Sequence, residues 1–412
     1  MRALGVMSIL FAVPIGAQTL TTIYTFAGGP NDGAIPGGLT ITSGRVLYAV
    51  TGEGGLSNVG TAFSLAPPVS PAGAWTETVL YNFAGGVGNE GFLPALTDHV
   101  GVLYGIRIAG GIRELGTVFA LTPPAAPGGV WTKNLLYSFS RRENGAAPSG
   151  PLVITGGTLC GVTSAGGTLS LGTVYSLTRP ATPGTQWSHA VLHTFAGGPA
   201  DGAFPAGLTV GNDRVLYGTT AFGGTFDYGT VFSLTPPASP GGAWTETVLY
   251  SFKGGTDGSQ PNGNLVIGSG EVLYGTTFSG GDSDFGTVYS VAPPASAGAP
   301  WTETVLHRFS GYPDGGLPEA GVVIGAGGVL YGATPYGGSS SDAGTVYSLT
   351  PPASSGGSWT ETILHSFSND SDGCNPAYLV ISNEGLLYGT TSACGNYNCS
   401  RFGCGTVFSL MP

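Results

Sequence analysis

The sequence has 412 residues, of which 74 are glycine, 41% are hydrophobic and only 8% are charged, and its formal net charge is −11. The hydrophobic fraction excludes a disordered chain, because disordered chains lack the apolar surface that offsets the entropy cost of folding. The 12 Lys and Arg residues form no basic patch, so nucleic acid is excluded as an expected partner.

Residues 1–17 are predicted to form a signal peptide. A positive end precedes an almost wholly apolar run from Ala3 to Gly16, and small residues suited to cleavage end the run. The run is too short to span a membrane comfortably. A buried N-terminal helix is the alternative, but the first repeat begins at Thr21, directly after the run. We therefore expect the mature chain, residues 18–412, to be secreted to the periplasm or cell surface.

Residues 18–412 are predicted to form a single domain of seven tandem repeats. Tryptophan recurs in steps of 56 to 58 residues, at Trp75, Trp131, Trp187, Trp244, Trp301 and Trp359. A Gly-Thr-(Val/Ala)-(Phe/Tyr) motif begins at Gly60, Gly116, Gly172, Gly229, Gly286, Gly344 and Gly405. A Leu-Tyr-Gly motif has its aromatic residue at Tyr48, Tyr104, Tyr217, Tyr274, Tyr331 and Tyr388, and Cys160 replaces it in the third copy. A fixed period of this length is typical of a repeat architecture.

Each copy contains four short runs rich in Val, Thr, Tyr and Leu, and we expect all of them to be strands. In the fifth copy the first three runs are Asn264–Ile267, Glu271–Thr277 and Thr287–Val291. Trp244–Phe252, just upstream, serves as the fourth run of the preceding copy. Four strands per repeat predict an all-β fold, a seven-bladed β-propeller of four-stranded blades.

The two ends of the chain are predicted to close the ring. Thr21–Phe26 matches the fourth-strand run Thr247–Phe252, whereas Gly405–Leu410, at the end of the sequence, matches a third strand. The last blade thus lacks a fourth strand of its own, and the N-terminal strand supplies it. Pairing the two satisfies backbone groups that an open edge leaves exposed.

Within each copy, the order of the Gly-Gly pair, the aromatic residue of the third strand and the tryptophan of the fourth strand resembles the Kelch repeat. The phrases "LYGTT..GG....GTVFSLTPP" and "WTETVLYSF.GG.DG..P" resemble more closely the GloVer tandem-repeat proteins, a bacterial family of exported repeat proteins. The resemblance covers Thr21–Pro412. It implies an exported repeat protein and says little about function. Members of the family carry varied C-terminal surface anchors, but this sequence stops at Met411-Pro412 and shows no anchor.

Two loop types are expected on one face of the ring. The loop from strand four to the next strand one carries an acidic or amide turn: Asp32-Gly33, Glu90-Gly91, Asn144-Gly145, Asp201-Gly202, Asp257-Gly258, Asp314-Gly315 and Asp372-Gly373. The loop between strands two and three carries a Gly-Gly pair. We interpret the Asp-Gly pairs as turns rather than calcium sites, because most copies offer one carboxylate. We expect no metal site and no cofactor.

The repeated polar residues offer no catalytic set. His193, His307 and His365 take a position that is Tyr in other copies, so they lie in different blades. Glu77, Glu246, Glu303 and Glu361 are expected to be solvated strand residues. The repeated Trp residues are expected to pack between sheets.

Residues that differ among copies are better ligand candidates. On the acidic-turn face these are Arg107, Phe222, Phe226, Tyr228, Phe278, Tyr336, Tyr397 and Arg401. Aromatic side chains on a surface of several loops suit a carbohydrate or protein ligand. We therefore expect a monomeric, non-enzymatic binding or scaffold protein. The alternative is a glycoside hydrolase or lyase that acts on polysaccharide, with acids near the channel mouth.

The cysteines are expected to form two disulfides in the last blade. Cys374 and Cys394 lie in two loops predicted on the same face, and a short turn separates Cys399 from Cys404. We predict the pairs Cys374–Cys394 and Cys399–Cys404, although other pairings such as Cys394–Cys399 remain open. Cys160 is expected to be a buried free thiol.

Overall fold

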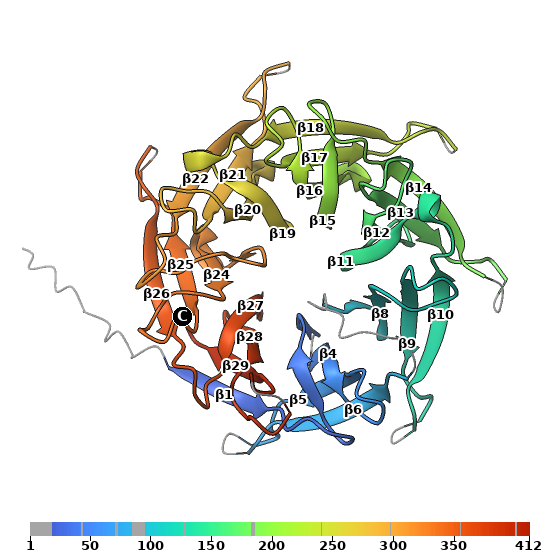
Figure 1. The fold of residues 1–412 in the computed structure, drawn as a ribbon, viewed down its shortest axis with the longest axis vertical. Helices are drawn as coiled ribbons and strands as arrows, with labels where there is room; N and C mark the ends of the chain where they lie inside the picture. The colour runs from blue at the N-terminus through green and yellow to red at the C-terminus, as the bar shows by residue number, and fades with distance from the viewer. Residues whose placement is uncertain are drawn as a thin grey trace, which may run out of the picture.

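The computed structural model describes residues 19–42, 44–70, 73–84, 95–126, 129–182, 186–239, 241–296, 298–354, 356–399 and 402–412. The predicted signal peptide lies outside these residues. The described residues form a ring of seven blades built from antiparallel strands (Figure 1). The all-β propeller predicted from the repeats is therefore confirmed.

The strands of each blade run in chain order from the centre to the rim (Figure 1). The innermost strands are β2 (Gly33–Pro36) with β3 (Thr40–Ile41), β7 (Thr97–His99), β11 (Ala146–Thr155), β15 (Gly202–Val210), β19 (Ser259–Ile267), β23 (Val323–Ile324) and β27 (Cys374–Ile381). The second strands are β4 (Leu47–Gly54), β8 (Val102–Arg107), β12 (Thr158–Ala165), β16 (Leu216–Gly223), β20 (Leu273–Ser279), β24 (Leu330–Thr334) and β28 (Leu387–Ala393).

The outer half of each blade is equally regular. The third strands are β5 (Thr61–Ala66), β9 (Thr117–Thr122), β13 (Thr173–Thr178), β17 (Thr230–Thr235), β21 (Thr287–Ala292), β25 (Thr345–Thr350) and β29 (Thr406–Leu410). The rim strands are β6 (Thr76–Asn82), β10 (Thr132–Ser138), β14 (Ser188–Thr194), β18 (Thr245–Ser251), β22 (Thr302–Arg308), β26 (Thr360–Ser366) and β1 (Leu20–Thr25).

Helical structure in the described ranges is limited to short 3-10 turns. They are η1 (Arg142–Asn144), η2 (Asn212–Arg214), η3 (Gly255–Asp257), η4 (Ser269–Glu271) and η5 (Ala326–Gly328). No helix within these ranges has the length and apolar character needed to cross a membrane.

The N-terminal strand closes the ring as predicted. β1 pairs with β29 in antiparallel register from Leu20 opposite Leu410 to Thr25 opposite Thr406. The last sheet therefore has the order β1-β29-β28-β27, with its outer strand supplied by the other end of the chain.

The innermost strand of the fifth blade begins earlier than predicted. The prediction started at Asn264, whereas β19 begins at Ser259, which pairs with Ser279. The register shifts between Asn262 and Val266, so the strand does not alternate regularly in sequence. β19 also contains Pro261, which is tolerated because the innermost strand is an edge strand.

Side chains repeated in every blade pack the blades against one another. Trp131 packs on Tyr48 of the preceding blade with ring centroids 6.2 Å apart, and Trp301 packs on Tyr217 at the same distance. In the third blade Cys160 replaces the tyrosine, and Trp244 packs against the cluster that contains this cysteine. The predicted packing role of the tryptophans is confirmed.

A glycine and a proline make a second contact between blades. Gly229, which begins a Gly-Thr motif, has a φ of 97°, a conformation that favours glycine. A Cβ atom there would lie 2.5 Å from the Cδ atom of Pro261 in the next blade. This proline therefore holds the start of the innermost strand against the preceding blade.

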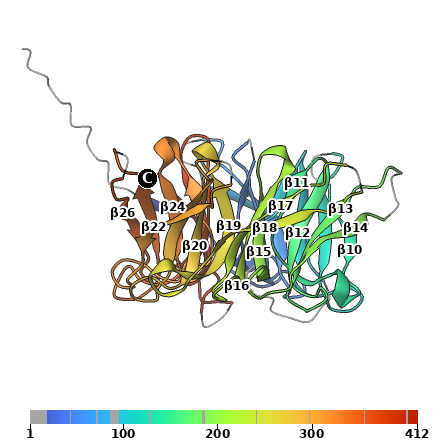
Figure 2. The same ribbon diagram turned by 90° about the horizontal axis from the view of Figure 1, so that it is seen from above.

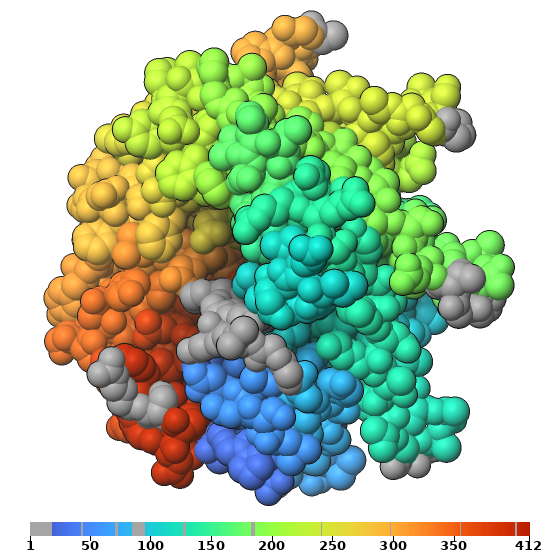
Figure 3. Space-filling model, turned by 45° about the vertical axis from the view of Figure 1, so that its right-hand side comes forward, coloured from blue at the N-terminus to red at the C-terminus, as the bar shows by residue number. Residues whose placement is uncertain are grey.

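The two predicted loop types lie on the same face. Gly281, in the loop between strands two and three, donates its N–H to the carbonyl of Gly255 in the acidic-turn loop over 2.8 Å. Figure 2 shows the ring from the side, with its loops gathered at two opposite faces. The linkers between third and fourth strands, such as residues 236–239, project from the rim in the space-filling view (Figure 3).

Candidate functional site

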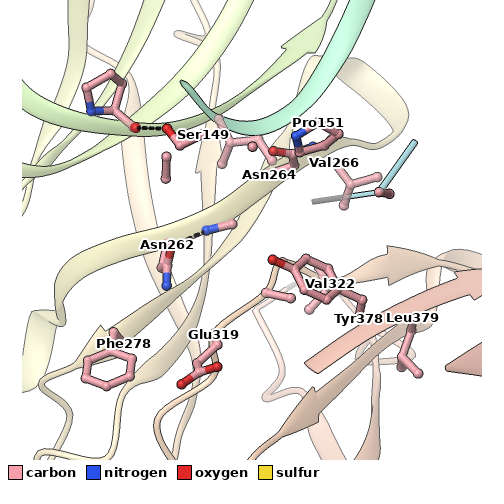
Figure 4. A pocket seen from close by; sticks show the side chains of 18 of the residues that line it. Ser149, Pro151, Asn262, Asn264, Val266, Phe278, Glu319, Val322, Tyr378 and Leu379 are labelled. Atoms are coloured by element: carbon pink, nitrogen blue, oxygen red, sulfur yellow. Dashed lines mark hydrogen bonds between the residues drawn. The ribbon is translucent and has the colours of Figure 1, made fainter. Parts of the chain in front are cut away.

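The centre of the ring contains a cavity of about 630 Å³. All seven blades contribute to its lining, from the first to the seventh through Leu39, Ala95, Ser149, Phe204, Asn262, Glu319 and Tyr378. Figure 4 shows Asn262, Phe278, Glu319 and Tyr378 around this cavity. We take the central cavity as the candidate site, because a concave, mostly apolar cavity with a few polar groups is the usual form of a ligand site.

One repeated position contributes to this lining in five of the blades. The residue directly after the repeated proline lines the cavity in the second to sixth blades, as Ala95, Ser149, Ala206, Asn262 and Glu319. The proline packs against the preceding blade and so fixes where the next side chain emerges. The position differs from copy to copy, and the cavity wall therefore differs from blade to blade.

Glu319 is the acidic group of the cavity. Its Oε2 atom is buried and has no hydrogen-bond partner. Burial raises the pKa of Glu319 to about 7. Burial, then the nearby Glu319, raises the pKa of the Tyr378 hydroxyl above its usual value. The carboxyl therefore lies near the tyrosine in an environment that penalises an uncompensated negative charge.

Amide and hydroxyl groups add hydrogen-bond acceptors. The Oδ1 atom of Asn264 is buried without a partner. Asn262 uses its own Oδ1 atom to accept the N–H of Gly263 over 2.9 Å, and Ser149 donates to the carbonyl of Pro205 over 3.2 Å. Glu319 Oε2 is thus a buried acceptor without a donor, whereas Asn264 Oδ1 lies against Gly207 of the preceding blade, where a Cβ atom would lie 1.8 Å from it.

Aromatic rings complete the lining. Phe278 lies on the second strand of the fifth blade, and Phe204 starts the innermost strand of the fourth. Phe204 also packs edge-on against Phe222, with centroids 5.8 Å apart. These rings offer flat apolar faces beside the polar groups, which is the combination that an amphipathic ligand requires.

The described residues of the cavity lining include one carboxyl group, that of Glu319. Glycoside hydrolysis ordinarily uses a pair of carboxyl groups that flank the bond to be cleaved. Among the residues that the structure describes, no group of three or more His, Cys, Asp or Glu side chains is placed to hold a metal ion. The described lining is suited to hydrogen bonding and stacking.

The predicted ligand residues do not form one site in the structure. Phe278 lines the cavity, and Phe222 packs against the cavity residue Phe204. Four aromatic residues are exposed on loops outside the cavity lining: Phe226, Tyr228, Tyr336 and Tyr397. The Tyr397 hydroxyl donates to the carbonyl of Asn369 over 3.1 Å. Arg401 lies outside the described residues.

Arg107 occupies a structural position. Its partner across the strands is Thr117, whereas the other six blades pair two buried threonines there, as Thr220 and Thr230 do over 2.8 Å. The guanidinium group of Arg107 donates to the carbonyl of Val59 and lies 5.0 Å from the centre of the Phe83 ring. Arg107 thus occupies the strand position at which the other blades have a buried threonine.

Sequence reasoning missed Glu319, Asn264 and Tyr378. The loops were searched for copy-to-copy variation, but the residues between the acidic turn and the predicted first strand were not considered. The available signal was the variable residue after the repeated proline, which is Glu319 after Pro318 and Asn262 after Pro261.

The glutamates of the rim strands are not solvated as predicted. Glu77, Glu246, Glu303 and Glu361 are only partly exposed, and the Oε1 atom of each is buried without a hydrogen-bond partner. Burial, then Asp257, raises the pKa of Glu303 to about 8. Burial, then the turn aspartate, also raises the pKa of Glu246 to about 7. The prediction was wrong because each glutamate lies at a joint between blades, beside a turn aspartate that the strand pattern does not reveal.

The turn aspartates stabilise these joints. Asp257 accepts the Tyr250 hydroxyl and the Lys253 N–H, both over 2.8 Å. Asp201 accepts the N–H groups of Ala196 and Gly202, both over 2.7 Å. These carboxylates accept protein donors, as turns require, which favours the turn interpretation over calcium sites. Glu90, in the second copy, lies outside the described residues.

The histidines belong to three separate joints. His193 lies 3.3 Å from Asp201, His307 lies 3.2 Å from Asp314, and each pair is partly buried. His365 lies 3.0 Å from Asp372 in the same way. Each histidine therefore contacts the turn aspartate of its joint, as Tyr250 contacts Asp257 in another blade.

The cysteines pair as predicted. Cys374 is bonded to Cys394 and Cys399 to Cys404. Cys160 is a buried free thiol, and burial raises its pKa to about 12. Both disulfides lie in the seventh blade, the blade closed by the N-terminal strand.

Comparison with known proteins supports the repeat and the fold. The model of the Gloeobacter/Verrucomicrobia repeat matches residues 8–175, 69–266 and 238–412. No curated protein matches the sequence.

Solved propeller structures are similar at low identity. The extracellular domain of a putative hybrid two component system from B. thetaiotaomicron has 10% identity and a TM-score of 0.52, covering 95% of this chain and 40% of that one. A putative oxidoreductase (glucose dehydrogenase) from Thermus thermophilus has 15% identity and a TM-score of 0.48, with 95% and 99% covered. A putative 6-phosphogluconolactonase from Bacteroides uniformis has 15% identity and a TM-score of 0.49, with 92% and 91% covered.

Proposed function

The chain belongs to the Gloeobacter/Verrucomicrobia repeat family, and on this basis we propose that it is an exported, non-enzymatic binding protein whose carbohydrate ligand occupies the central cavity. The observation that carries the proposal is the lining of that cavity. In its described part, it combines aromatic rings, polar side chains and a single carboxyl group, of which one oxygen has no hydrogen-bond partner.

The size and chemistry of the cavity support a carbohydrate ligand. A volume of about 630 Å³ lies in the usual range for small-ligand sites. A sugar ring presents an apolar face of C–H groups, which can stack on Phe278, and a rim of hydroxyl donors. Those donors suit the carboxyl group of Glu319 and the polar side chains of Asn262 and Ser149, which line the same cavity.

A polysaccharide-cleaving enzyme is the competing function. It needs a second acid or a nucleophile within reach of Glu319, and the described part of the cavity lining offers no second carboxyl. This favours binding over hydrolysis.

Export is supported by the cysteines and by the N-terminal residues. Two disulfides in one blade suit an oxidising compartment outside the cytoplasm. We propose that residues 1–17 are the export signal, that residues 18–412 form the secreted propeller, and that it acts in the periplasm or at the cell surface as a monomer.

A glycan array and a hydrolysis screen of the purified mature protein test the proposal. We expect selective binding to one or more glycans and no release of reducing ends from any of them. Turnover of a glycan that is abolished by Glu319→Gln contradicts the binding function and supports the enzyme. If no glycan on the array binds, the proposal of a carbohydrate ligand is wrong.

A further inference from the structure

The central cavity contains an acidic side chain, Glu319, whose charge the proposed function does not explain. Among the residues that the structure describes, Glu319 is the only charged side chain that lines the cavity, and no Lys or Arg accompanies it there. Its Oε2 atom is buried and accepts no hydrogen bond. A carboxylate in such a place is costly unless a positive partner arrives.

The neighbouring groups also favour a positive partner. Phe278 and Tyr378 line the same cavity, and aromatic faces attract cations. The net charge of the whole chain, −11, draws cationic ligands toward the protein and repels acidic ones.

We propose that the central cavity binds an amino sugar, with its ammonium group paired to the Glu319 carboxylate. This inference rests on the proposed function and specifies its ligand. The ammonium group pairs with the Glu319 carboxylate, the ring stacks on Phe278, and the sugar hydroxyls form hydrogen bonds with polar side chains of the lining. A sugar is preferred to a lysine peptide because Asn262 and Ser149 line the cavity beside the carboxyl group, and hydroxyl groups suit such side chains.

The pairing predicts a direction for the pH dependence. Burial raises the pKa of Glu319 to about 7, so a large part of this group is protonated in slightly acidic solution. An ammonium ligand binds the ionised form and displaces that proton. Affinity for a positively charged amino sugar is therefore expected to rise between about pH 5.5 and pH 7.

The test compares three trisaccharides that share one β-1,4-linked backbone. Trimers of glucosamine, N-acetylglucosamine and glucose differ only in the substituent at carbon 2, which is an amine, an amide and a hydroxyl. Calorimetric titration of the mature protein at about pH 6.5 is expected to give at least about tenfold tighter binding of the glucosamine trimer. Glu319→Gln keeps the shape of the side chain and is expected to reduce that preference to within about threefold.

Two controls make the result specific. Glu143→Gln alters an exposed acid outside the cavity lining and is expected to leave all three affinities unchanged. A trilysine peptide carries amines without sugar rings and is expected to bind at least about tenfold more weakly than the glucosamine trimer.

The outcomes separate this inference from the function on which it rests. Equal or tighter binding of the neutral trimers, equal binding of trilysine, or an unchanged amine preference in Glu319→Gln overturns the amino-sugar assignment. A glycan array that is positive for neutral sugars alone also overturns it and leaves the carbohydrate-binding function standing. An array without any binding contradicts both.

Discussion

The hydroxyl of Tyr250, at the end of one blade, donates to Asp257 Oδ1, in the turn that enters the next blade, over 2.8 Å. Glu303, on the rim strand of that next blade, lies close enough for the Asp257 charge to act on it. The rim of the propeller therefore contains acidic groups that share a joint, and its stability depends on their protonation.

The first prediction concerns that pH dependence. Burial, then Asp257, raises the pKa of Glu303 from 4.5 to about 8. The folded state holds this proton more tightly than the unfolded state, so the stabilisation is present below about pH 4.5 and is lost as the pH rises through about 8. Glu303→Gln removes this contribution. The free energy of unfolding, measured with urea, is expected to fall between about pH 5 and about pH 8. We expect this fall to be smaller in the variant than in the parent protein, by on the order of 1–2 kcal/mol once solvent screening is allowed for.

Glu143→Gln is the matched control for this experiment, because Glu143 is exposed. It is expected to leave the pH dependence as in the parent protein. If Glu303→Gln loses as much stability between the two pH values as the parent protein, protonation of Glu303 does not stabilise the fold.

The second prediction concerns the tyrosine of the same joint. Tyr250→Phe removes the donor and leaves Asp257 Oδ1 without it. The free energy of unfolding is expected to fall by about 1–2 kcal/mol, the usual cost of losing one partly buried hydrogen bond to a charged group. Tyr312→Phe, at an exposed tyrosine, is expected to change it by less than about 0.5 kcal/mol. Equal effects of the two variants contradict a role for the hydrogen bond.

The third prediction concerns the cysteines. A non-reduced digest of the secreted protein is expected to contain Cys374 linked to Cys394 and Cys399 linked to Cys404. Replacing both Cys374 and Cys394 by alanine opens a loop with a sequence separation of 20 and is expected to cost about 3 kcal/mol. Cys160, which is buried, is expected to react with a thiol reagent only after unfolding. A bridge that involves Cys160 contradicts the assignment.

The fourth prediction distinguishes the cavity from the exposed aromatic loops. Phe278→Ala removes an aromatic face from the cavity and is expected to weaken binding of an array-positive glycan by about tenfold. Phe226→Ala, at an exposed ring outside the cavity lining, is expected to change the affinity by less than about threefold. A larger loss in Phe226→Ala locates the ligand on the loops.

Most of the fold could be predicted from the sequence, because its information is local and repeated. The offset between Thr21–Phe26 and Gly405–Leu410 predicted that the N-terminal strand pairs with the last strand and closes the ring, as β1 and β29 do. Repeated tryptophans predicted blade packing, and the turn positions of Cys374 and Cys394 predicted their bond.

The site and the rim joints were harder to predict, because they depend on contacts between blades. Phe278 was found as a variable aromatic residue, but Glu319 was missed because the search for variable residues covered aromatic and basic side chains on the loops. Glu303 was interpreted as a solvated strand residue because it is repeated among the copies. Asp257 reaches Glu303 from a different segment, and the repeat pattern does not reveal that contact.

The most direct test of the channel as the ligand site is a variant that fills it. Ala206 lines the cavity at the variable position after Pro205, and Ser149 lies at the same position one blade earlier. Titration of an array-positive glycan into Ala206→Trp and Ser149→Trp, each checked for an unchanged circular dichroism spectrum, is expected to show a loss of affinity of at least about tenfold. Binding as tight as that of the parent protein in both folded variants contradicts a ligand in the central cavity.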